Sequence, residues 1–287
     1  MKFLIFGGNG FLGTYLYKFI SKKYKVKRVT RKKNVGIYLL NFNPKKIQKI
    51  INKEKVDIII NTIAYTNLDQ CEISKKKAFN SNVLILKNIV NAIKNLNLKK
   101  KPFLIHISTD QVYSGKGPHI ESNAKPINWY SKTKLESEKY LKYINGCVLR
   151  TNFLGKSKTH YNFNNWIDQN VQKNKKIFGY KNIFFSPISM ETLAKKIIFI
   201  SKKKINGTYK LGSKGGISKG NYISYFLKKK YPYYKKFELI NYKNSKNKKK
   251  AKRPLDMRLN SSKIISTFSF KLPKTKIEVN KIINNYK

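Results

Sequence analysis

Short apolar segments alternate with helical patterns over the first 150 residues, and this alternation limits the possible folds more than any other feature. The apolar segments predict strands at 2–6, 24–29, 36–40, 56–62, 102–108 and 146–150. The patterns between them predict helices at 11–23, 44–55, 76–96 and 128–144. Fully apolar strands separated by helices are typical of a parallel sheet covered on both faces. The sequence therefore predicts an α/β fold built on a doubly wound parallel sheet.

The pattern loosens after residue 150 into segments rich in aromatic residues and Asn. A helix at about 190–203, a strand near 207–212, a helix after 218–223 and closing helices at 260–268 and 275–286 are expected there, with a polar loop at 243–254. We expect residues 1–150 to form the main domain. Residues 151–287 would form a smaller lobe on the edge of the sheet, able to exchange strands or helices with the first part.

The formal charge of +50 raises the question of nucleic-acid binding, because 63 Lys and Arg face only 13 Asp and Glu. Only five of the 63 are arginines, and the lysines are spread along the whole chain with abundant Asn and Ile. Recognition of bases and phosphates favours Arg, whereas uniform Lys indicates a coding bias toward A- and T-rich codons. We therefore expect no nucleic-acid partner, although the charge should attract anionic ligands.

The sequence gives little indication of a membrane protein, a metalloprotein or a secreted protein. No apolar stretch reaches the roughly 18 residues that a membrane helix needs, and glycines interrupt the apolar run at the start, which reads as strand, turn and helix rather than a signal peptide. Cys71 and Cys147 lie far apart, and the three histidines are scattered. This pattern predicts a protein of the reducing cytoplasm without a metal site.

A glycine-rich turn connects the first strand to the first helix. In the segment GGNGFLG, Gly7, Gly10 and Gly13 have GxxGxxG spacing, and Gly8, Gly10 and Gly13 have GxGxxG spacing. Such glycines let the backbone approach a pyrophosphate, whose charge is stabilised by the free N–H groups of the helix N-terminus. Because the turn follows the first strand of a βαβ series, it predicts a Rossmann domain that binds a nicotinamide dinucleotide.

The end of the second strand indicates which dinucleotide is bound. An acidic residue there would bind the ribose 2′-hydroxyl of NAD, and a basic one would accept the extra phosphate of NADP. The chain has Thr30, Arg31, Lys32 and Lys33, with no carboxylate. NADP(H) is therefore preferred and NAD(H) remains possible, with Arg31 as the informative residue.

Tyr130 and Lys134 are spaced four residues apart on a predicted helix, so they share one face. A nearby ammonium lowers the pKa of a phenol, which lets Tyr exchange a proton with a substrate oxygen. Other Tyr/Lys pairs have this spacing, but only Tyr130 follows a strand that ends in hydroxyls, at Ser108 and Thr109. This position singles out Tyr130 and Lys134 as the candidate catalytic pair.

The glycine turn and the segments NTIAYTNLDQCE, STDQVY, YSKTK and RPLDMRLNSSK together resemble the extended short-chain dehydrogenase/reductase superfamily, and within it the dTDP-4-dehydrorhamnose reductase family. The resemblance runs from residue 1 to about residue 265. It implies NADPH-dependent reduction of the 4-keto group of a nucleotide-linked 6-deoxy sugar, as used for surface polysaccharides.

The resemblance also implies a role for each matching residue. The catalytic residues would be Thr109, Tyr130 and Lys134. The cofactor would contact Gly7, Gly10, Phe11, Leu12, Gly13, Arg31, Asn61, Ala64, Thr66, Tyr130 and Lys134. The substrate would contact Thr109, Asp110, Gln111, Asn128, Phe153 and Arg253, and no metal is expected.

Two departures from the family pattern leave the sugar and the assembly open. Phe153 stands where the reductases usually have Trp, and Thr14 and Tyr15 stand where some carry a Glu that takes part in a metal-linked dimer. A homodimer is possible.

The same residues also bear on four other possible functions. A 4,6-dehydratase needs two carboxyl groups at the place where this chain has Asp110 and Gln111, and the amide cannot act as the base. An epimerase would keep the same Tyr and Lys and stays open. A non-catalytic regulatory subunit is disfavoured by the intact Thr109, Tyr130 and Lys134, and an RNA-binding protein is disfavoured by the lack of clustered Arg and of aromatic RNA-binding motifs.

Overall fold

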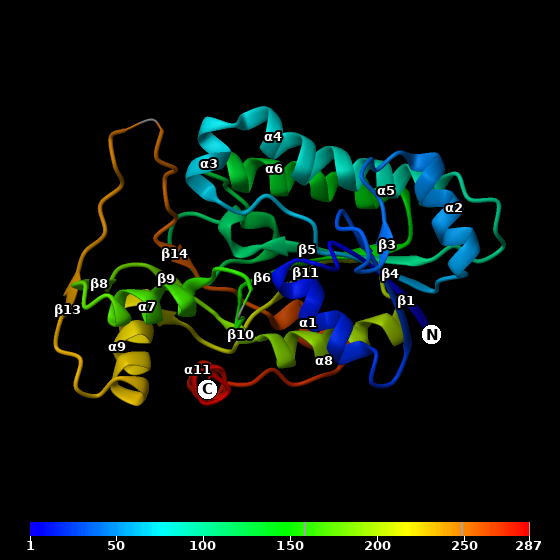
Figure 1. The fold of residues 1–287 in the computed structure, drawn as a ribbon. Helices are drawn as coiled ribbons and strands as arrows, with labels where there is room; N and C mark the ends of the chain where they lie inside the picture. Colours follow the sequence, from blue (N-terminus) through cyan, green and yellow to red (C-terminus); the bar gives the residue numbers. More distant parts are fainter. Residues whose placement is uncertain (158, 248, 287) are drawn as a thin grey trace.

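The computed structural model describes residues 1–157, 159–247 and 249–286 (Figure 1). Its centre is a seven-stranded sheet with the order β11-β6-β5-β4-β1-β2-β3, in which every neighbouring pair is parallel. The strands are β1 (Lys2–Phe6), β2 (Lys25–Thr30), β3 (Ile37–Tyr38), β4 (Ile58–Asn61), β5 (Phe103–Thr109), β6 (Gly146–Thr151) and β11 (Gly207–Leu211). The predicted α/β class with a doubly wound parallel sheet is confirmed.

Helices cover both faces of the sheet because its strands are apolar on both sides (Figure 1). Phe3 and Ile5 of β1 face one core cluster, whereas Leu4 and Phe6 face the other. The first cluster packs against α1 (Phe11–Ile20), α8 (Met190–Lys203) and α10 (Ser262–Phe268), and the second against α2 (Pro44–Glu54) and α5 (Ile85–Lys94). This double burial explains why the strands read as continuous apolar runs.

The long helix predicted at 76–96 is divided in the structure. It begins as α4 (Lys75–Phe79), passes through a π-helical turn, η1 (Asn80–Leu84), and continues as α5. A short helix that was not predicted, α3 (Leu68–Ile73), precedes it, and α6 (Trp129–Glu138) ends in the 3₁₀ turn η4 (Lys139–Tyr143). Single π turns of this kind leave no signal in hydrophobic periodicity.

Residues after 151 contribute to two places. The segments β11, α8 and α10 join the sheet layer, while the rest builds a lobe with its own apolar core. The lobe contains β7 (Phe153–Leu154), α7 (Phe163–Gln172), β8 (Ile177–Tyr180), β9 (Phe184–Phe185), β10 (Ile188–Ser189), β12 (Ile217–Ser218), α9 (Lys219–Lys230), β13 (Phe237–Ile240), β14 (Asp256–Met257) and α11 (Thr275–Asn284). The predicted polar loop at 243–254 contains no helix or strand in its described part, and Lys248 lies outside the described residues.

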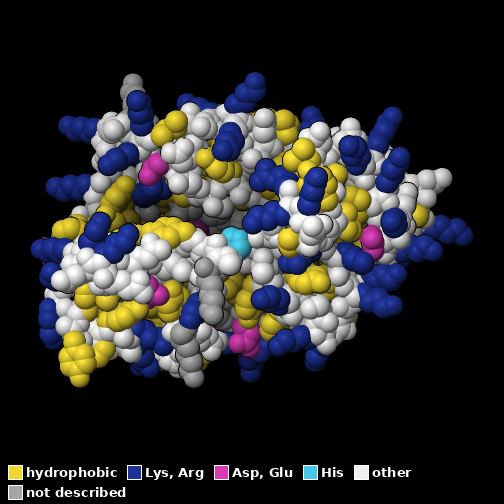
Figure 2. Space-filling model, viewed as in Figure 1, with side chains coloured by type: hydrophobic (Ala, Val, Ile, Leu, Met, Phe, Trp, Pro, Cys, Tyr) yellow, Lys and Arg dark blue, Asp and Glu magenta, His cyan; other side chains and the backbone are white. Residues whose placement is uncertain are grey.

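The fold places a site at one edge of the sheet. Because the strands are parallel, β1, β4, β5 and β6 all end at the same edge, and ligands of such folds bind there. Figure 2 shows the surface hollowed between the layer with α3 and α6 and the lobe with α7 and α9, with Lys and Arg side chains scattered over the whole face. Within the described residues, no helix is long and apolar enough to span a membrane.

Candidate active site

Two adjoining cavities lie at the carboxyl edge of the sheet and share Gly10, Thr62 and Ala64 in their walls. The first, of about 650 Å³, contains Tyr130 and Lys134 and is called the tyrosine cavity. The second, of about 560 Å³, contains Arg31 and is called the arginine cavity. The shared wall makes the pair one elongated site with two compartments, which suits a ligand with two bulky ends.

The glycine turn forms the floor between the two cavities and has no room for side chains. Gly7 has φ +80°, and a Cβ there would lie 2.7 Å from Thr62 Oγ1, whereas a Cβ at Gly13 would lie 2.1 Å from the carbonyl oxygen of Gly7. The N-cap residue of α1, Gly10, supplies no side-chain oxygen to the first turn. The free N–H groups of this turn, with Phe11 and Leu12 in the cavity wall, are therefore suited to an anionic group.

The arginine cavity is basic at the end of β2. Arg31 and Lys32 line it together with Thr30, whose hydroxyl accepts a hydrogen bond from the Lys32 N–H at 3.0 Å. No Asp or Glu is among its lining residues. The predicted place for a ribose phosphate thus contains cations and no competing carboxylate.

Tyr130 and Lys134 lie one turn apart on α6, are almost fully buried, and both line the tyrosine cavity. Helix α6 starts with a capping box, in which the Asn128 side chain accepts from the Ser131 N–H at 2.8 Å. The Lys134 ammonium donates to the carbonyl oxygen of Ile107 at 2.9 Å, which ties α6 to β5. The capped helix and this bond fix the position of the catalytic pair.

Burial sets the proton affinities of this pair. It raises the pKa of Tyr130, and the neighbouring Thr109 hydroxyl lowers it only in part. Burial also lowers the pKa of Lys134 to about 8. The sequence predicted that Lys134 would lower the Tyr130 pKa, but in the ligand-free protein burial prevails and the phenol keeps its proton at neutral pH.

The end of β5 brings Thr109, Asp110 and Gln111 to the wall of the tyrosine cavity. The Thr109 hydroxyl accepts from the Gln111 N–H at 3.1 Å, and Asp110 Oδ2 accepts from Asn152 Nδ2 at 2.8 Å. Burial raises the pKa of Asp110 to about 6, although the bond from Asn152 opposes this rise. Gln111 Oε1 is buried and has no hydrogen-bond partner among the described residues, which leaves it free to bind a ligand hydroxyl.

Three further predicted residues line the cavities. Ala64 belongs to both walls, whereas Thr66 and Phe153 belong to the tyrosine cavity. The Phe153 ring lies 6.0 Å from that of Phe11, so it forms an apolar wall beside the glycine turn.

Four predicted residues do not line either cavity: Gly13, which packs against the Gly7 carbonyl oxygen beneath the turn, and Asn61, Asn128 and Arg253. Asn61 is buried behind the site, where its Oδ1 accepts from the Ile63 N–H at 3.1 Å. Asn128 caps α6 and donates to the carbonyl oxygen of Lys252 at 2.9 Å. Arg253 pairs with Asp69 of α3 at 3.0 Å, so the structure holds it outside the cavity wall.

Several lining residues were not identified from the sequence. Asn152, His160, Tyr161 and Phe163 come from the segment that follows β6. His160 Nε2 lies 2.7 Å from the carbonyl oxygen of Asn9, which connects this segment to the glycine turn. Asn152 could have been found from its position directly after a sheet strand, but His160 and Tyr161 lie in a loop without a recognisable pattern, and Phe163 begins α7, which was not predicted.

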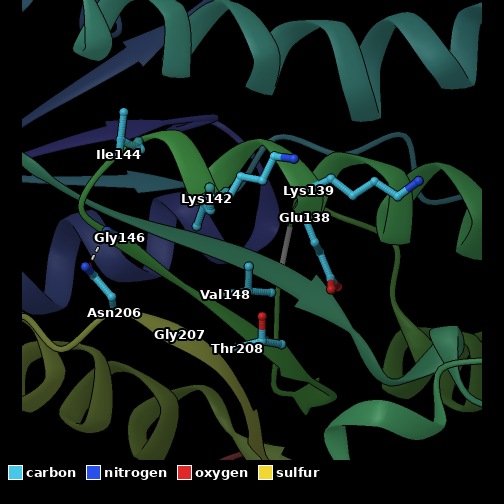
Figure 3. A pocket seen from close by; sticks show the side chains of 10 residues that line it. Glu138, Lys139, Lys142, Ile144, Gly146, Val148, Asn206, Gly207 and Thr208 are labelled. Atoms are coloured by element: carbon cyan, nitrogen blue, oxygen red, sulfur yellow. Dashed lines mark hydrogen bonds between the residues drawn. The ribbon is translucent and has the colours of Figure 1, made fainter.

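A separate pocket of about 420 Å³ lies where β6 and β11 begin, at the opposite edge of the sheet. Figure 3 shows Glu138 reaching it from the helical layer and Val148 and Thr208 reaching it from the sheet. The Glu138 carboxylate is already bound by Arg150 Nη2 at 2.6 Å and by Ser108 Oγ at 2.5 Å. Glu138 is the one acidic residue among the described residues that line this pocket, and its bonds give it a structural role. The pocket is therefore not a second reaction site.

Comparison with known proteins gives one family for the whole chain. A family model described as the RmlD substrate binding domain matches residues 1–287. A dTDP-4-dehydrorhamnose reductase of Escherichia coli strain K12 is 26% identical over 259 residues, with 84% of each chain covered. A dTDP-D-glucose 4,6-dehydratase of Dictyostelium discoideum is 33% identical over 153 residues, which span 46% of this chain and only 35% of that protein.

The solved structures agree on the fold. A dTDP-4-dehydrorhamnose reductase of Bacillus anthracis, solved in complex with NADP, superposes with a TM-score of 0.85 at 21% identity. The match covers 99% of this chain and 98% of that one. The likeness therefore extends over both the sheet layer and the lobe.

Proposed function

This chain belongs to the family described as the RmlD substrate binding domain, and on that premise we propose that it reduces the 4-keto group of a nucleotide-linked 6-deoxy sugar with NADPH. The reaction is that of a dTDP-4-dehydrorhamnose reductase, within the synthesis of sugars for surface polysaccharides. One observation carries the proposal: Thr109, Tyr130 and Lys134 line one cavity, and the glycine turn adjoins that cavity.

The cofactor assignment rests on the shape and charge of the two compartments. The glycine turn and the first turn of α1 would hold the pyrophosphate, and Arg31 with Lys32 would hold the 2′-phosphate in the arginine cavity. Lys134 and Tyr130 would lie beside the nicotinamide half in the tyrosine cavity. Bound NADPH would supply the hydride, and the complex of the Bacillus anthracis reductase with NADP agrees with this choice.

The protein's own groups supply the proton and polarise the carbonyl. Tyr130 keeps its proton at neutral pH because burial raises its pKa, so it can act as the acid that protonates the keto oxygen. The Thr109 hydroxyl, in the same wall, would donate a hydrogen bond to that oxygen. Hydride addition at carbon and proton addition at oxygen together turn C=O into CH–OH.

The wall of the tyrosine cavity favours reduction over dehydration. Removal of a proton and expulsion of a hydroxyl need a base and an acid, but Asp110 is the only carboxyl group among the described lining residues. Gln111 instead offers an unpartnered amide oxygen that would accept from a sugar hydroxyl, and Phe153 would pack against the sugar ring. The resemblance of half of the chain to a dehydratase therefore reflects the shared fold and cofactor site.

Asn128 and Arg253 do not line the cavities, so we propose that they contribute to substrate binding indirectly, by positioning a neighbouring segment. Both hold segment 251–253 against α3 and α6, through the Lys252 carbonyl oxygen and Asp69. Segment 251–253 would border the entrance for the nucleotide, where Arg253 could exchange Asp69 for a phosphate.

The division of the chain into two lobes, the homodimer and the cytoplasmic location are also part of this proposal. Residues 1–150 supply all three catalytic groups, and residues 151–287 supply the facing wall with Phe153 and Phe163. A homodimer remains a prediction. The free, buried thiols of Cys71 and Cys147 agree with work in the reducing cytoplasm.

The proposal is tested with purified protein, NADPH and dTDP-4-dehydrorhamnose, followed by the loss of NADPH absorbance. Substitution Tyr130→Phe should lower turnover by about 10²–10⁴-fold, as expected for removal of a general acid, and should leave the cofactor Kd nearly unchanged. The control is Tyr225→Phe, which removes a phenol from a Tyr/Lys pair of the same spacing on α9, away from both cavities. Equal turnover in wild type and Tyr130→Phe would contradict the assignment.

An epimerase and a regulatory subunit give different outcomes in the same assay. An epimerase would convert a sugar nucleotide without net loss of NADPH. A regulatory subunit would oxidise no NADPH with any ketosugar nucleotide.

A further inference from the structure

A buried histidine lies directly behind Lys134, on the side away from the cavity. His106 is fully buried in the middle of β5, and its Nε2 lies 3.2 Å from Lys134 Nζ. The same nitrogen lies 3.3 Å from Ser137 Oγ, and Nδ1 lies 3.1 Å from Asn61 Nδ2. The catalytic amine therefore contacts an imidazole whose other nitrogen is held by a second buried side chain.

The hydrogen bonds around Asn61 determine which imidazole nitrogen carries the proton. Asn61 Oδ1 accepts from the Ile63 N–H at 3.1 Å, so the amide NH₂ faces His106. A flipped amide would set two donors against each other at Ile63. An amide nitrogen only donates, and His106 Nδ1 must therefore accept. Burial and the charge of Lys134 hold the pKa of His106 well below its usual value, so the ring is neutral and carries its proton on Nε2.

This tautomer favours the uncharged form of Lys134. A neutral amine can accept a hydrogen bond from Nε2–H, whereas an ammonium would set its own N–H groups against that proton. When Lys134 is charged, Ser137 Oγ still offers Nε2–H an acceptor at 3.3 Å, because its own hydrogen goes to the Lys134 carbonyl oxygen at 2.7 Å. Both states are thus possible, and the histidine shifts their balance toward the amine.

Glu138 acts on Lys134 through its charge, which raises the Lys134 pKa against the larger effect of burial. Glu138, one turn further along α6, is bound by Arg150 of β6 and by Ser108 of β5. Asp110 of η2 (Asp110–Val112) and the Cys71 thiol of α3 act on Tyr130. No carboxylate forms an ion pair with Lys134 in the described part of the chain. His106 is the polar side chain that contacts Lys134 Nζ most directly.

We propose that the Asn61–His106 pair is a positioning element for the proton chemistry of Lys134: it presents Nε2–H to the amine and brings the charged and uncharged forms close in energy near neutral pH. The inference rests on the proposed reductase function. After Tyr130 has given its proton to the sugar oxygen, the tyrosinate takes one from the Lys134 ammonium, and the resulting amine takes one from water. A lysine with the usual pKa of about 10.4 would give up its proton much less readily.

The tautomer is tested first, on the ligand-free protein. The ¹⁵N spectrum of the imidazole rings contains signals from three histidines only, and His106→Phe identifies the signal of interest by its loss. We expect a neutral Nε2–H ring across the range where the protein is folded, and we expect Asn61→Leu to allow the Nδ1–H form. A wild-type ring that is protonated on Nδ1, or on both nitrogens, would overturn the proposal.

The consequence for Lys134 is tested by the pH dependence of kcat, because kcat includes the return of a proton to Tyr130 in each turnover. Activity should fall above the pKa of Lys134, because the ammonium is needed to reprotonate Tyr130. His106→Phe and Asn61→Leu should each move this alkaline limb upward by about one pH unit, roughly tenfold in the protonation equilibrium. His119→Phe is the control, since this buried histidine bonds the Asp256 carbonyl oxygen and lies outside both cavities. A uniform loss of activity with an unmoved limb would show a merely structural role.

A third measurement separates this proposal from the proposed function. In protein with ¹⁵N-labelled lysine amines, Lys134 should titrate near pH 8, and Lys134→Met should remove that titration. The midpoint should rise in His106→Phe and Asn61→Leu. This result needs no turnover, so it stands or falls independently of the substrate assignment, and unchanged midpoints in both variants would refute the role of the pair.

Discussion

Single residues determine the chemistry of this site through burial more than through sequence spacing. The Tyr130/Lys134 spacing occurs elsewhere in the chain, and what distinguishes this pair is its burial in the wall of the cavity that also contains Thr109. Burial keeps the proton on Tyr130 and lowers the pKa of Lys134 to about 8. The two groups are thereby adjusted for proton donation at neutral pH.

Arg31 is the residue on which the cofactor preference depends. Substitution Arg31→Asp should lower the ratio of kcat/KM for NADPH over NADH by at least about tenfold, because a carboxylate repels the 2′-phosphate and binds a ribose hydroxyl instead. Steady-state kinetics with both cofactors measure this ratio. Lys33→Asp makes the same charge change outside the arginine cavity and should leave the ratio nearly unaltered. An unchanged ratio in Arg31→Asp would contradict the assignment of Arg31 to the 2′-phosphate.

Most of the residues predicted for the site line the two cavities, because strand ends and glycine spacing are local signals. Gly10, Thr109 and Tyr130 all lie in the cavity walls. His106 was missed because one polar residue inside an apolar strand gives no indication of what it contacts. The position of Arg253 could not be inferred either, since its ion pair with Asp69 joins segments that are 184 residues apart.

At the level of helices and strands, buried charge connects the sheet to the catalytic helix. Arg150 of β6 binds Glu138 of α6 through Nε and Nη2, and Ser108 of β5 donates to the same carboxylate. Arg150 also donates to the Tyr113 hydroxyl at 2.7 Å. This group of contacts holds α6 over β5 and β6, and so holds Tyr130 in register with Thr109.

Substitution Glu138→Gln should lower the free energy of unfolding by about 3–5 kcal/mol, because it leaves the Arg150 guanidinium buried without its partner. Urea unfolding measures the change. Glu136→Gln is the control on the same helix, where the exposed pair with Lys139 is screened by solvent and should contribute little to stability. The double substitution Glu138→Met/Arg150→Met should recover much of the loss. A loss of similar size in Glu136→Gln would contradict the account.

The strands before residue 150 were predicted well, whereas the helices α3 and α7 and the two-residue strands of the lobe were not. The six strands expected before residue 150 are all present, because each has an apolar run bounded by polar residues. The lobe strands β7, β9, β10, β12 and β14 have only two residues each, too few to show any period. Their formation depends on tertiary contacts, such as the packing of Phe185 of β9 against Tyr222 of α9.

For the whole molecule, the order of the strands explains where the ligand compartments lie. The sheet order places β1 between β4 and β2, so the glycine turn after β1 separates the two cavities. The addition of β11 from the second half of the chain was not deducible from local patterns. It pairs in parallel with β6 and thus extends the sheet layer toward the lobe.

The most direct test of the central claim is to follow the transferred hydrogen itself. Purified protein is given dTDP-4-dehydrorhamnose and NADPH in which both hydrogens at C4 of the nicotinamide are deuterium, and the product sugar is analysed by mass and by NMR. The account predicts one deuterium at C4 of the sugar for each NADPH consumed, and none with Tyr130→Phe on the same timescale. A converted sugar without deuterium, or deuterium at another carbon, would contradict it.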